Sequence, residues 1–268
     1  MQTVRPGEAL RIVAFNIRYN NPADGINAWD ARRGRCLQAI RKLNPDLLAL
    51  QEVLAGPQVE LAEALADYGA VAVHRDDGKF AGEATPIFYR KSRFERVDHG
   101  VFWLSTTPSV IGSVGWDASI CTWARLKDLA TRRELLLANA HFDHMGTAAR
   151  TNIAKLIMAK MKEIAEALPV IMAGDLNSFD DSPAYAEFVR DSHACGPGWT
   201  DTFRAMHAPS PDEETCHDFK GRIAGRRIDY VFVSPEFATL SAGIDRDRDS
   251  ERLFASDHYP VWCDLAWR

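Results

Sequence analysis

Short apolar runs recur along the whole chain and constrain its fold more than any other feature. They occupy residues 10–15, 47–50, 70–73, 87–89, 135–140, 170–173, 230–233 and 259–262. Runs of this length, rich in β-branched and aromatic residues, are typical of strands that are buried on at least one face. The sequence therefore predicts sheets whose strands share a common core.

Helical patterns separate some of these runs. Residues 31–43 and 147–168 repeat apolar side chains at three- and four-residue spacing, and a proline shortly after each pattern prevents it from continuing. Residues 56–68 are a third candidate helix. Between residues 71 and 140, strands follow one another without an obvious long helix, which indicates antiparallel meanders. The expected fold class is therefore α+β, with sheets packed face to face and helices outside.

The composition limits the class of protein. A length of 268 residues suits one large domain or two small ones, and 46% hydrophobic with 26% charged residues is ordinary for a soluble globular protein. A net charge of −5 and a pI near 5.9 argue against an enzyme that grips long nucleic-acid duplexes, because that requires a basic face. Two basic clusters are interpreted as solvated surface: Arg32, Arg33 and Arg35, and Arg222, Arg226 and Arg227.

The cysteines and the N-terminus indicate a cytoplasmic protein. The five cysteines are widely spaced and lack a Cys-x-x-Cys pair, which indicates reduced, mostly buried thiols rather than disulfides or a zinc site. Residues 1–10 contain no apolar run of signal-peptide length, and no stretch approaches the roughly 20 apolar residues of a membrane span. We therefore expect a cytoplasmic location and no membrane span.

Polar residues stand at the ends of the apolar runs. Asn16 closes the first run, and Glu52 comes shortly after residues 47–50. Asn16 alone is more typical of a turn, because asparagine forms local backbone hydrogen bonds. A carboxylate at the end of a buried strand must face water, a cation or a paired base, since burying it alone costs several kcal/mol. Glu52 is therefore either exposed or part of a site.

Two further groups combine residues that carry acid–base chemistry. His141, Asp143 and His144 follow one run, and imidazole with carboxylate supplies proton transfer or metal ligation near neutral pH. A half-buried, hydrogen-bonded histidine is the alternative. After another run, Asp175 and Asn177 stand two positions apart. Both can point to the same side of an extended backbone, or they form an Asx-turn.

The last group comes from two C-terminal segments. Asp229 precedes residues 230–233, and His258 precedes residues 259–262. A carboxylate on one strand can therefore orient an imidazole on its neighbour, which fixes the tautomer of the histidine and raises its basicity. Beside the other groups, the string Ser-Asp-His-Tyr-Pro-Val at residues 256–261 is improbable by chance.

Taken in order, these groups resemble the endonuclease/exonuclease/phosphatase superfamily of deoxyribonuclease I-like proteins. The motifs are Phe-Asn-Ile-Arg, Gln-Glu, His-Phe-Asp-His, Gly-Asp-Leu-Asn, Ile-Asp-Tyr and Ser-Asp-His-Tyr-Pro-Val, and the resemblance covers residues 12–261. Residues 102–105 and 116–117 further resemble a bacterial branch of uncharacterised members. The resemblance implies a four-layered α/β sandwich with two mainly antiparallel sheets, formed by a single domain of residues 1–268 with its core at about 10–266.

The resemblance also implies a metal site. Glu52 would be the principal ligand of Mg²⁺ or Mn²⁺, and Asn16 and Asp257 would complete the metal-side ligands. Hard carboxylate oxygens select these metals over softer ones. A divalent cation neutralises a phosphate ester and stabilises its leaving oxygen during in-line attack by water, so that no nucleophilic serine or cysteine is needed.

The resemblance assigns the remaining roles to residues at the other strand ends. Asp175 would orient or deprotonate the attacking water, and Asn177 would hold a phosphate oxygen. His141 would donate a hydrogen bond to a non-bridging oxygen of the phosphate. His258, paired with Asp229, would stabilise the transition state.

Further residues are expected near the substrate. Several nucleases of the superfamily carry an acidic residue two positions after the first asparagine, where this chain has Arg18, so activity on abasic sites does not transfer directly. For Glu83 and His144, packing at the rim of the core is the alternative. The expected substrate contacts are Arg18, Glu83, Asp143, His144 and Trp116.

The leading prediction is a phosphodiesterase or nuclease-like hydrolase that uses metal-assisted in-line attack by water. A phosphomonoesterase acting on a sugar or inositol phosphate is the alternative within enzymes, and a non-catalytic phosphate-binding domain is the alternative of another class. The expected partner is a phosphate ester (nucleic acid, phospholipid-like or sugar phosphate), and we expect a monomer without an obligate protein partner. Loops at residues 20–29, 75–82, 102–116 and 205–226 are expected to set the substrate.

Overall fold

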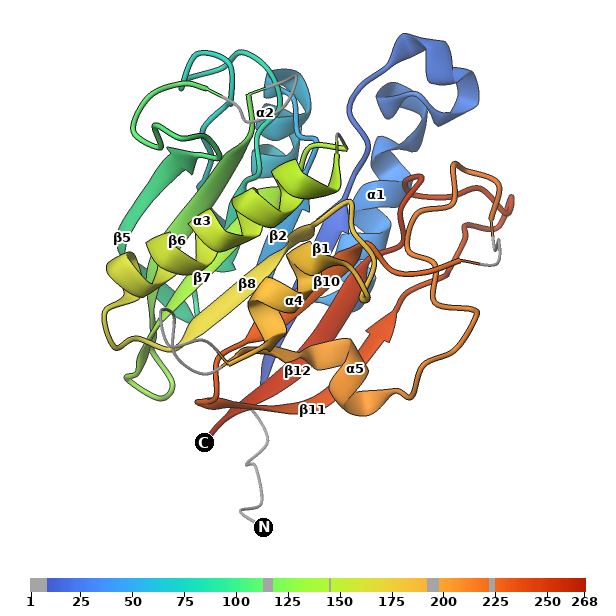
Figure 1. The fold of residues 1–268 in the computed structure, drawn as a ribbon. Helices are drawn as coiled ribbons and strands as arrows, with labels where there is room; N and C mark the ends of the chain where they lie inside the picture. The colour runs from blue at the N-terminus through green and yellow to red at the C-terminus, as the bar shows by residue number, and fades with distance from the viewer. Residues whose placement is uncertain (1–8, 113–117, 145, 192–197, 222–224) are drawn as a thin grey trace.

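Two sheets packed face to face, with helices outside, form the body of the protein (Figure 1). The computed structural model describes residues 9–112, 118–144, 146–191, 198–221 and 225–268. In spatial order the first sheet contains β11 (Phe237–Ile244), β12 (Val261–Trp267), β1 (Leu10–Asn16), β2 (Leu47–Gln51), β4 (Ile87–Arg90) and β3 (Tyr68–Val71). The second contains β5 (Phe94–Trp103), β6 (Ile120–Asp128), β7 (Glu134–His141), β8 (Val170–Asp175), β10 (Asp229–Val233) and β9 (Thr200–Asp201).

The strand pairing is mainly antiparallel. One pair in each sheet, β1 with β2 and β7 with β8, is parallel, and the other neighbouring strands run antiparallel. The predicted four-layered sandwich of two mainly antiparallel sheets is confirmed. The two parallel pairs face each other across the sandwich, where β1 and β2 contact β8.

The central strands are buried on both faces, which explains their continuous apolar runs. In β1, Ile12 faces the second sheet and Val13 faces the helices of the first. In β8, Ile171 likewise packs between the sheets, whereas Met172 packs against the helices on the other side. Alternate residues of one strand thus belong to different cores, so both sets must be apolar.

Helices cover the two outer faces. The first sheet is covered by α1 (Trp29–Leu43) and α2 (Ala55–Ala64), and the second by α3 (Thr147–Ala165) and α4 (Pro183–Val189) (Figure 1). The short 3-10 helix η1 (Pro22–Asn27) precedes α1, and α5 (Thr202–Met206) follows β9. Among the described residues, no helix has both the length and the hydropathy that crossing a bilayer requires.

The predicted helix boundaries agree with the structure to within four residues, and α2 ends at Ala64, four residues before the predicted end at residue 68. The first helix ends at Leu43, followed by Asn44 in the left-handed conformation (φ 48°) before the proline. Helix α3 ends at Ala165, three residues before the predicted end at residue 168. Glu166 has φ 53°, a conformation that does not continue a right-handed helix, so the chain turns there.

Two arginines of the predicted surface clusters are buried. Arg32 is inaccessible to solvent and donates hydrogen bonds to backbone carbonyls, including those of Ile17 and Arg18. Arg227 is 1% exposed, and its Nη2 lies 2.7 Å from Oδ2 of Asp201. The expectation of solvated surface is therefore wrong for these two side chains. Arg32 bonds through all three of its guanidinium nitrogens, and Arg227 bonds through Nη1 and Nη2 to Asp201; these fixed acceptors offset the cost of burial.

Candidate active site

The strand register brings the polar residues of the motifs to one edge of the sandwich. Asn16 ends β1 opposite Gln51 of β2. In the second sheet, His141 at the end of β7 pairs with Asp175 of β8, and Asp175 pairs in turn with Asp229 of β10. Because β10 runs antiparallel to β8, its first residue lies beside the last residue of β8. Residues far apart in the sequence thus form one row.

Asn16 joins the two sheets at this edge. Its Nδ2 atom donates to Oε1 of Glu52 at 2.8 Å and to Oδ2 of Asp175, in the other sheet, at 3.1 Å. Its Oδ1 atom accepts a hydrogen bond from the backbone N–H of Arg18 at 3.0 Å. Both ends of the Asn16 amide are therefore engaged by protein groups, and the side chain connects two carboxylates.

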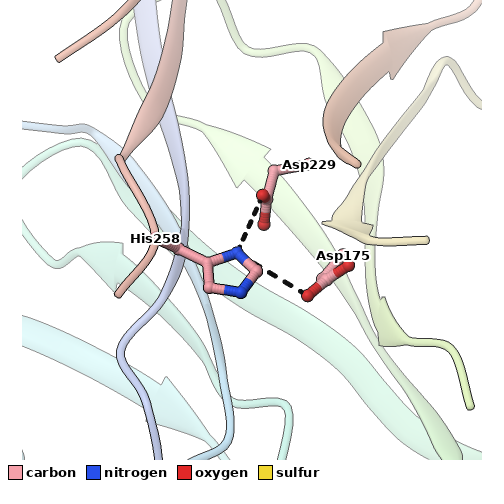
Figure 2. A group of neighbouring side chains, drawn as sticks. All are labelled: Asp175, Asp229 and His258. Carbon is pink, nitrogen blue, oxygen red and sulfur yellow. Dashed lines mark hydrogen bonds and ion pairs between the residues drawn. The ribbon is translucent and has the colours of Figure 1, made fainter. Parts of the chain in front are cut away.

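His258, Asp229 and Asp175 form a compact buried cluster (Figure 2). Nδ1 of His258 lies 2.9 Å from Oδ2 of Asp229 and 3.8 Å from Oδ2 of Asp175. One ligand atom from each residue lies within 4.8 Å of the others, a spacing that a metal ion can also use. Because Nδ1 of the imidazole already bonds to Asp229, the cluster is better described as two carboxylates around one histidine.

The charges in this cluster shift one another's protonation. Burial lowers the pKa of His258, but the Asp229 carboxylate outweighs it and holds the pKa well above its ordinary value. Burial and the nearby Asp229 charge raise the pKa of Asp175 to about 6. A protonated His258 therefore lies between two acids, and Asp175 is poised to exchange a proton close to neutral pH.

His141 and Asn177 lie on the other side of Asp175. Nε2 of His141 is 3.2 Å from Nδ2 of Asn177 and 3.5 Å from Oδ2 of Asp175. Nδ1 of His141 lies 3.8 Å from the carboxylate of Glu83. Asn177 has φ 45°, and its backbone N–H donates to Oδ1 of Asp175 at 2.8 Å. The Asx-turn, which was the alternative interpretation of these two residues, is therefore present, and His141 lies beside both Asn177 and Asp175.

Glu52 and Asp257 are neighbouring carboxylates. Burial acts to raise the pKa of Glu52, but His141 and His258, with hydrogen bonds from Asn16 and from the backbone of Tyr19, lower it below its ordinary value.

Burial raises the pKa of Asp257, and the negative charge of Glu52 adds to the shift, against the opposing effects of His258 and Arg18. A divalent cation between two such carboxylates would relieve their repulsion, and hard oxygen donors suit Mg²⁺ or Mn²⁺. The donor set therefore fits a metal of this kind, which Glu52 and Asp257 would hold.

A polar cavity of about 420 Å³ opens at this edge. Asp143 is buried in its wall, whereas the His144 side chain is 76% exposed at its rim. Trp116 lies outside the described residues. The predicted site residues that line the cavity are Arg18, Glu52, Glu83, His141, Asp143, His144, Asp175, Asn177 and His258.

Sequence reasoning missed Tyr19, Arg75 and Ser119, which also line the cavity. Nη1 of Arg75 lies 3.1 Å from Glu83, across a loop whose ends pair through the backbone. The sequence pointed to Arg75 only through its position at the start of a loop that was expected to determine substrate specificity. Its approach to Glu83, eight residues later, depends on the shape of that loop.

The strand ends of the two facing sheets bring carboxylates, an amide and two imidazoles into one polar cavity. Such a set of groups is typical of hydrolases that act on phosphate esters. Comparison with known proteins agrees. The sequence profile of the Endonuclease/Exonuclease/phosphatase family matches residues 13–258, so the chain belongs to this family. It is accordingly a hydrolase of phosphate esters.

Solved structures of the family resemble the chain over nearly its whole length. An endonuclease/exonuclease/phosphatase from Bacteroides vulgatus is 37% identical, with a TM-score of 0.89 over 97% of this chain and 99% of that one. A mannosyl-6-phosphatase from Bacteroides thetaiotaomicron is 32% identical, with a TM-score of 0.88 over 96% of this chain and 100% of that one.

Curated sequences are more distant. An uncharacterised protein of Acanthamoeba polyphaga mimivirus is 26% identical over 64% of this chain and 68% of its own length. The chain spans about half the length of other curated relatives that it matches.

Proposed function

We propose that the protein is a divalent-metal-dependent phosphomonoesterase that acts on a small phosphorylated molecule such as a sugar phosphate. The single observation that carries this proposal is the cavity, whose volume of about 420 Å³ suits a monosaccharide phosphate. The likeness to the Bacteroides mannosyl-6-phosphatase, at 32% identity, supports the same substrate class. The net charge of −5 also offers little attraction to a polyanion.

Glu52 and Asp257 would hold Mg²⁺ or Mn²⁺, and the bound ion would neutralise phosphate charge and stabilise the leaving oxygen. Asn16, predicted as a third ligand, would serve instead to orient Glu52, because its amide is engaged by Glu52, Asp175 and the backbone of Arg18. A carboxylate held in one rotamer binds a cation with less loss of entropy.

Asp175 would orient the attacking water and accept its proton, for which a pKa of about 6 is well suited. The charged imidazole of His258, fixed by Asp229, would donate to a phosphate oxygen and stabilise the negative charge of the transition state. Asn177 and His141 would contact the remaining oxygens, with Glu83 facing the Nδ1 side of the His141 ring.

The phosphodiesterase favoured from the sequence is the second candidate. Its support is the same set of strand-end residues, which suits either ester. The protein should be assayed with p-nitrophenyl phosphate, bis-p-nitrophenyl phosphate and a panel of sugar phosphates, with Mg²⁺ or Mn²⁺ and again after chelation. We expect kcat/KM to be highest for a monoester and to be abolished by chelation. A higher value for the diester would reverse the order of the two candidates.

A non-catalytic phosphate-binding domain is the third candidate. Glu52→Gln separates it from the enzymes, because loss of the charged ligand should lower turnover by several orders of magnitude. Glu134→Gln is a suitable control, because Glu134 pairs with Arg125 on the partly exposed surface of β6 and β7. If the metal-loaded protein hydrolyses none of the phosphate esters, the phosphate-binding domain is the candidate function that remains.

A further inference from the structure

Arg18 places a fixed positive charge in the wall of the active-site cavity. Its Nε atom lies 3.0 Å from Oδ2 of Asp24 and 3.8 Å from Oδ2 of Asp257. Its guanidinium carbon lies 4.4 Å from the centre of the Tyr19 ring. These contacts hold the guanidinium beside the Asp257 carboxylate, with 25% of the side chain still exposed in the cavity.

The backbone of Arg18 is strained in a way that serves this placement. Arg18 has φ 58°, a left-handed conformation that is uncommon for residues other than glycine. Its N–H donates to Oδ1 of Asn16, and its carbonyl accepts from the buried guanidinium of Arg32. Strain of this kind persists only where the surroundings impose it, and it concentrates at functional sites.

Arg18 also retains a donor for a ligand. Its Nε and Nη2 atoms bond to Asp24, and within the described part of the chain Nη1 has no hydrogen-bond partner in the protein. Arg75, another arginine that lines the cavity, has its Nη1 atom 3.1 Å from Oε2 of Glu83. Arg18 is therefore the guanidinium beside Asp257 from which a ligand can accept a hydrogen bond.

We propose that the Arg18 guanidinium binds an oxygen of the substrate phosphate beside the metal carboxylates and gives the site its preference for a dianionic phosphate. This inference rests on the function proposed above. A monoester carries one more negative charge than a diester and has three non-bridging oxygens instead of two. It therefore gains more from a fixed, always protonated cation that donates in a defined direction.

The direct test measures binding of inorganic phosphate to the metal-free protein by calorimetry in the presence of a chelator. Arg18→Gln should weaken binding about 10- to 100-fold, as expected for one charge-assisted hydrogen bond. Arg18→Lys should recover part of it, because the charge is kept and the directed donor is lost. Arg125→Gln is the matched control, an arginine likewise paired to one carboxylate, Glu134, but on the surface of β6.

Unchanged phosphate binding in Arg18→Gln would overturn the inference. Circular dichroism melting checks that the variants fold. If Arg18→Gln does not fold, Arg18→Lys provides the test in its place. With metal present, Arg18→Gln should lower kcat/KM for p-nitrophenyl phosphate at least about tenfold more than for its bis-ester. Equal losses on both esters would assign Arg18 a structural role.

The two proposals fail separately. If the wild-type protein hydrolyses esters but Arg18→Gln binds phosphate normally, only the role of Arg18 is wrong. If wild type binds phosphate through Arg18 yet hydrolyses no ester, the proposed function is wrong and the binding site remains.

Discussion

Nδ1 of His258 lies 2.9 Å from Oδ2 of Asp229, although the strands at whose starts the two residues stand belong to different sheets. Asp229 is the first residue of β10 in the second sheet, and His258 stands just before β12 in the first. The pair therefore depends on how the sheets are stacked, because neither sheet contains both partners.

This pairing predicts that the two residues act as a unit. Asp229→Asn and His258→Gln should each lower kcat by about 10²- to 10⁴-fold, because the imidazole loses either its orienting carboxylate or its charge. The double variant should be little worse than the worse single variant. Steady-state kinetics on the best monoester measure all three, and multiplicative losses would show that the residues act independently.

The raised pKa of Asp175 predicts a conflict between activity and stability. The folded-state pKa, about 6, exceeds the ordinary value of an aspartate, so its contribution to stability is full in acid and is lost as the pH rises through 6. Asp175→Asn should be inactive. In the metal-free protein, however, its free energy of unfolding should rise by about 1–2 kcal/mol relative to that of wild type as the pH is raised from about 5 to about 8. Urea unfolding at both pH values measures this, and an equal difference at both would contradict it.

His217 should make the protein sensitive to acid. Its ring is buried, and the ring centroid lies 4.1 Å from that of Tyr259 and 4.4 Å from that of Phe254. Burial lowers the pKa of His217 to about 4. A depressed folded-state pKa contributes stability above the unfolded value, and this stability is lost as the pH falls toward 4. The free energy of unfolding of His217→Phe should therefore rise by about 2 kcal/mol relative to that of wild type as the pH is lowered from about 8 to about 5. A pH-independent difference in denaturant unfolding would argue against this.

The buried pair of Arg227 and Asp201 should contribute strongly to stability. Arg227→Met leaves the buried Asp201 carboxylate without its guanidinium partner and should destabilise the fold by about 3–5 kcal/mol. Adding Asp201→Asn should recover part of this loss, because an amide keeps the hydrogen bonds to the start of α5. Chemical unfolding measures both variants, and a loss below about 1 kcal/mol would mean that the pair is dispensable.

The sequence predicted best those elements that are buried on both faces. Strands β1, β2, β7, β8 and β10 coincide with apolar runs because alternate residues fill two cores. Strand β5 was not delimited, because residues 95–99 are exposed and include three charged side chains, Glu95, Arg96 and Asp98. Strand β11 at the edge of the first sheet was missed for a related reason, since only Phe237 and Ala242 of its residues are buried and no regular apolar pattern marks it.

The candidate site was predicted from strand ends, and its convergence in space follows from the sheet register. The sequence could not predict that Arg32 is buried or that Arg18 turns back toward Asp257, because each depends on acceptors from distant segments. It also placed Asn16 among the metal ligands. We propose instead that Asn16 orients Glu52, because the structure directs the Asn16 amide to Glu52, Asp175 and the backbone.

The bridge from Asn16 to Asp175 crosses the seam between the two layers of strands. A small slip of one layer over the other would separate the groups of the reaction centre while leaving every strand paired within its own sheet. Turnover should therefore cease at a lower denaturant concentration than circular dichroism reports for loss of secondary structure. Enzymatic rate would then serve as a sensitive gauge of how the layers are aligned.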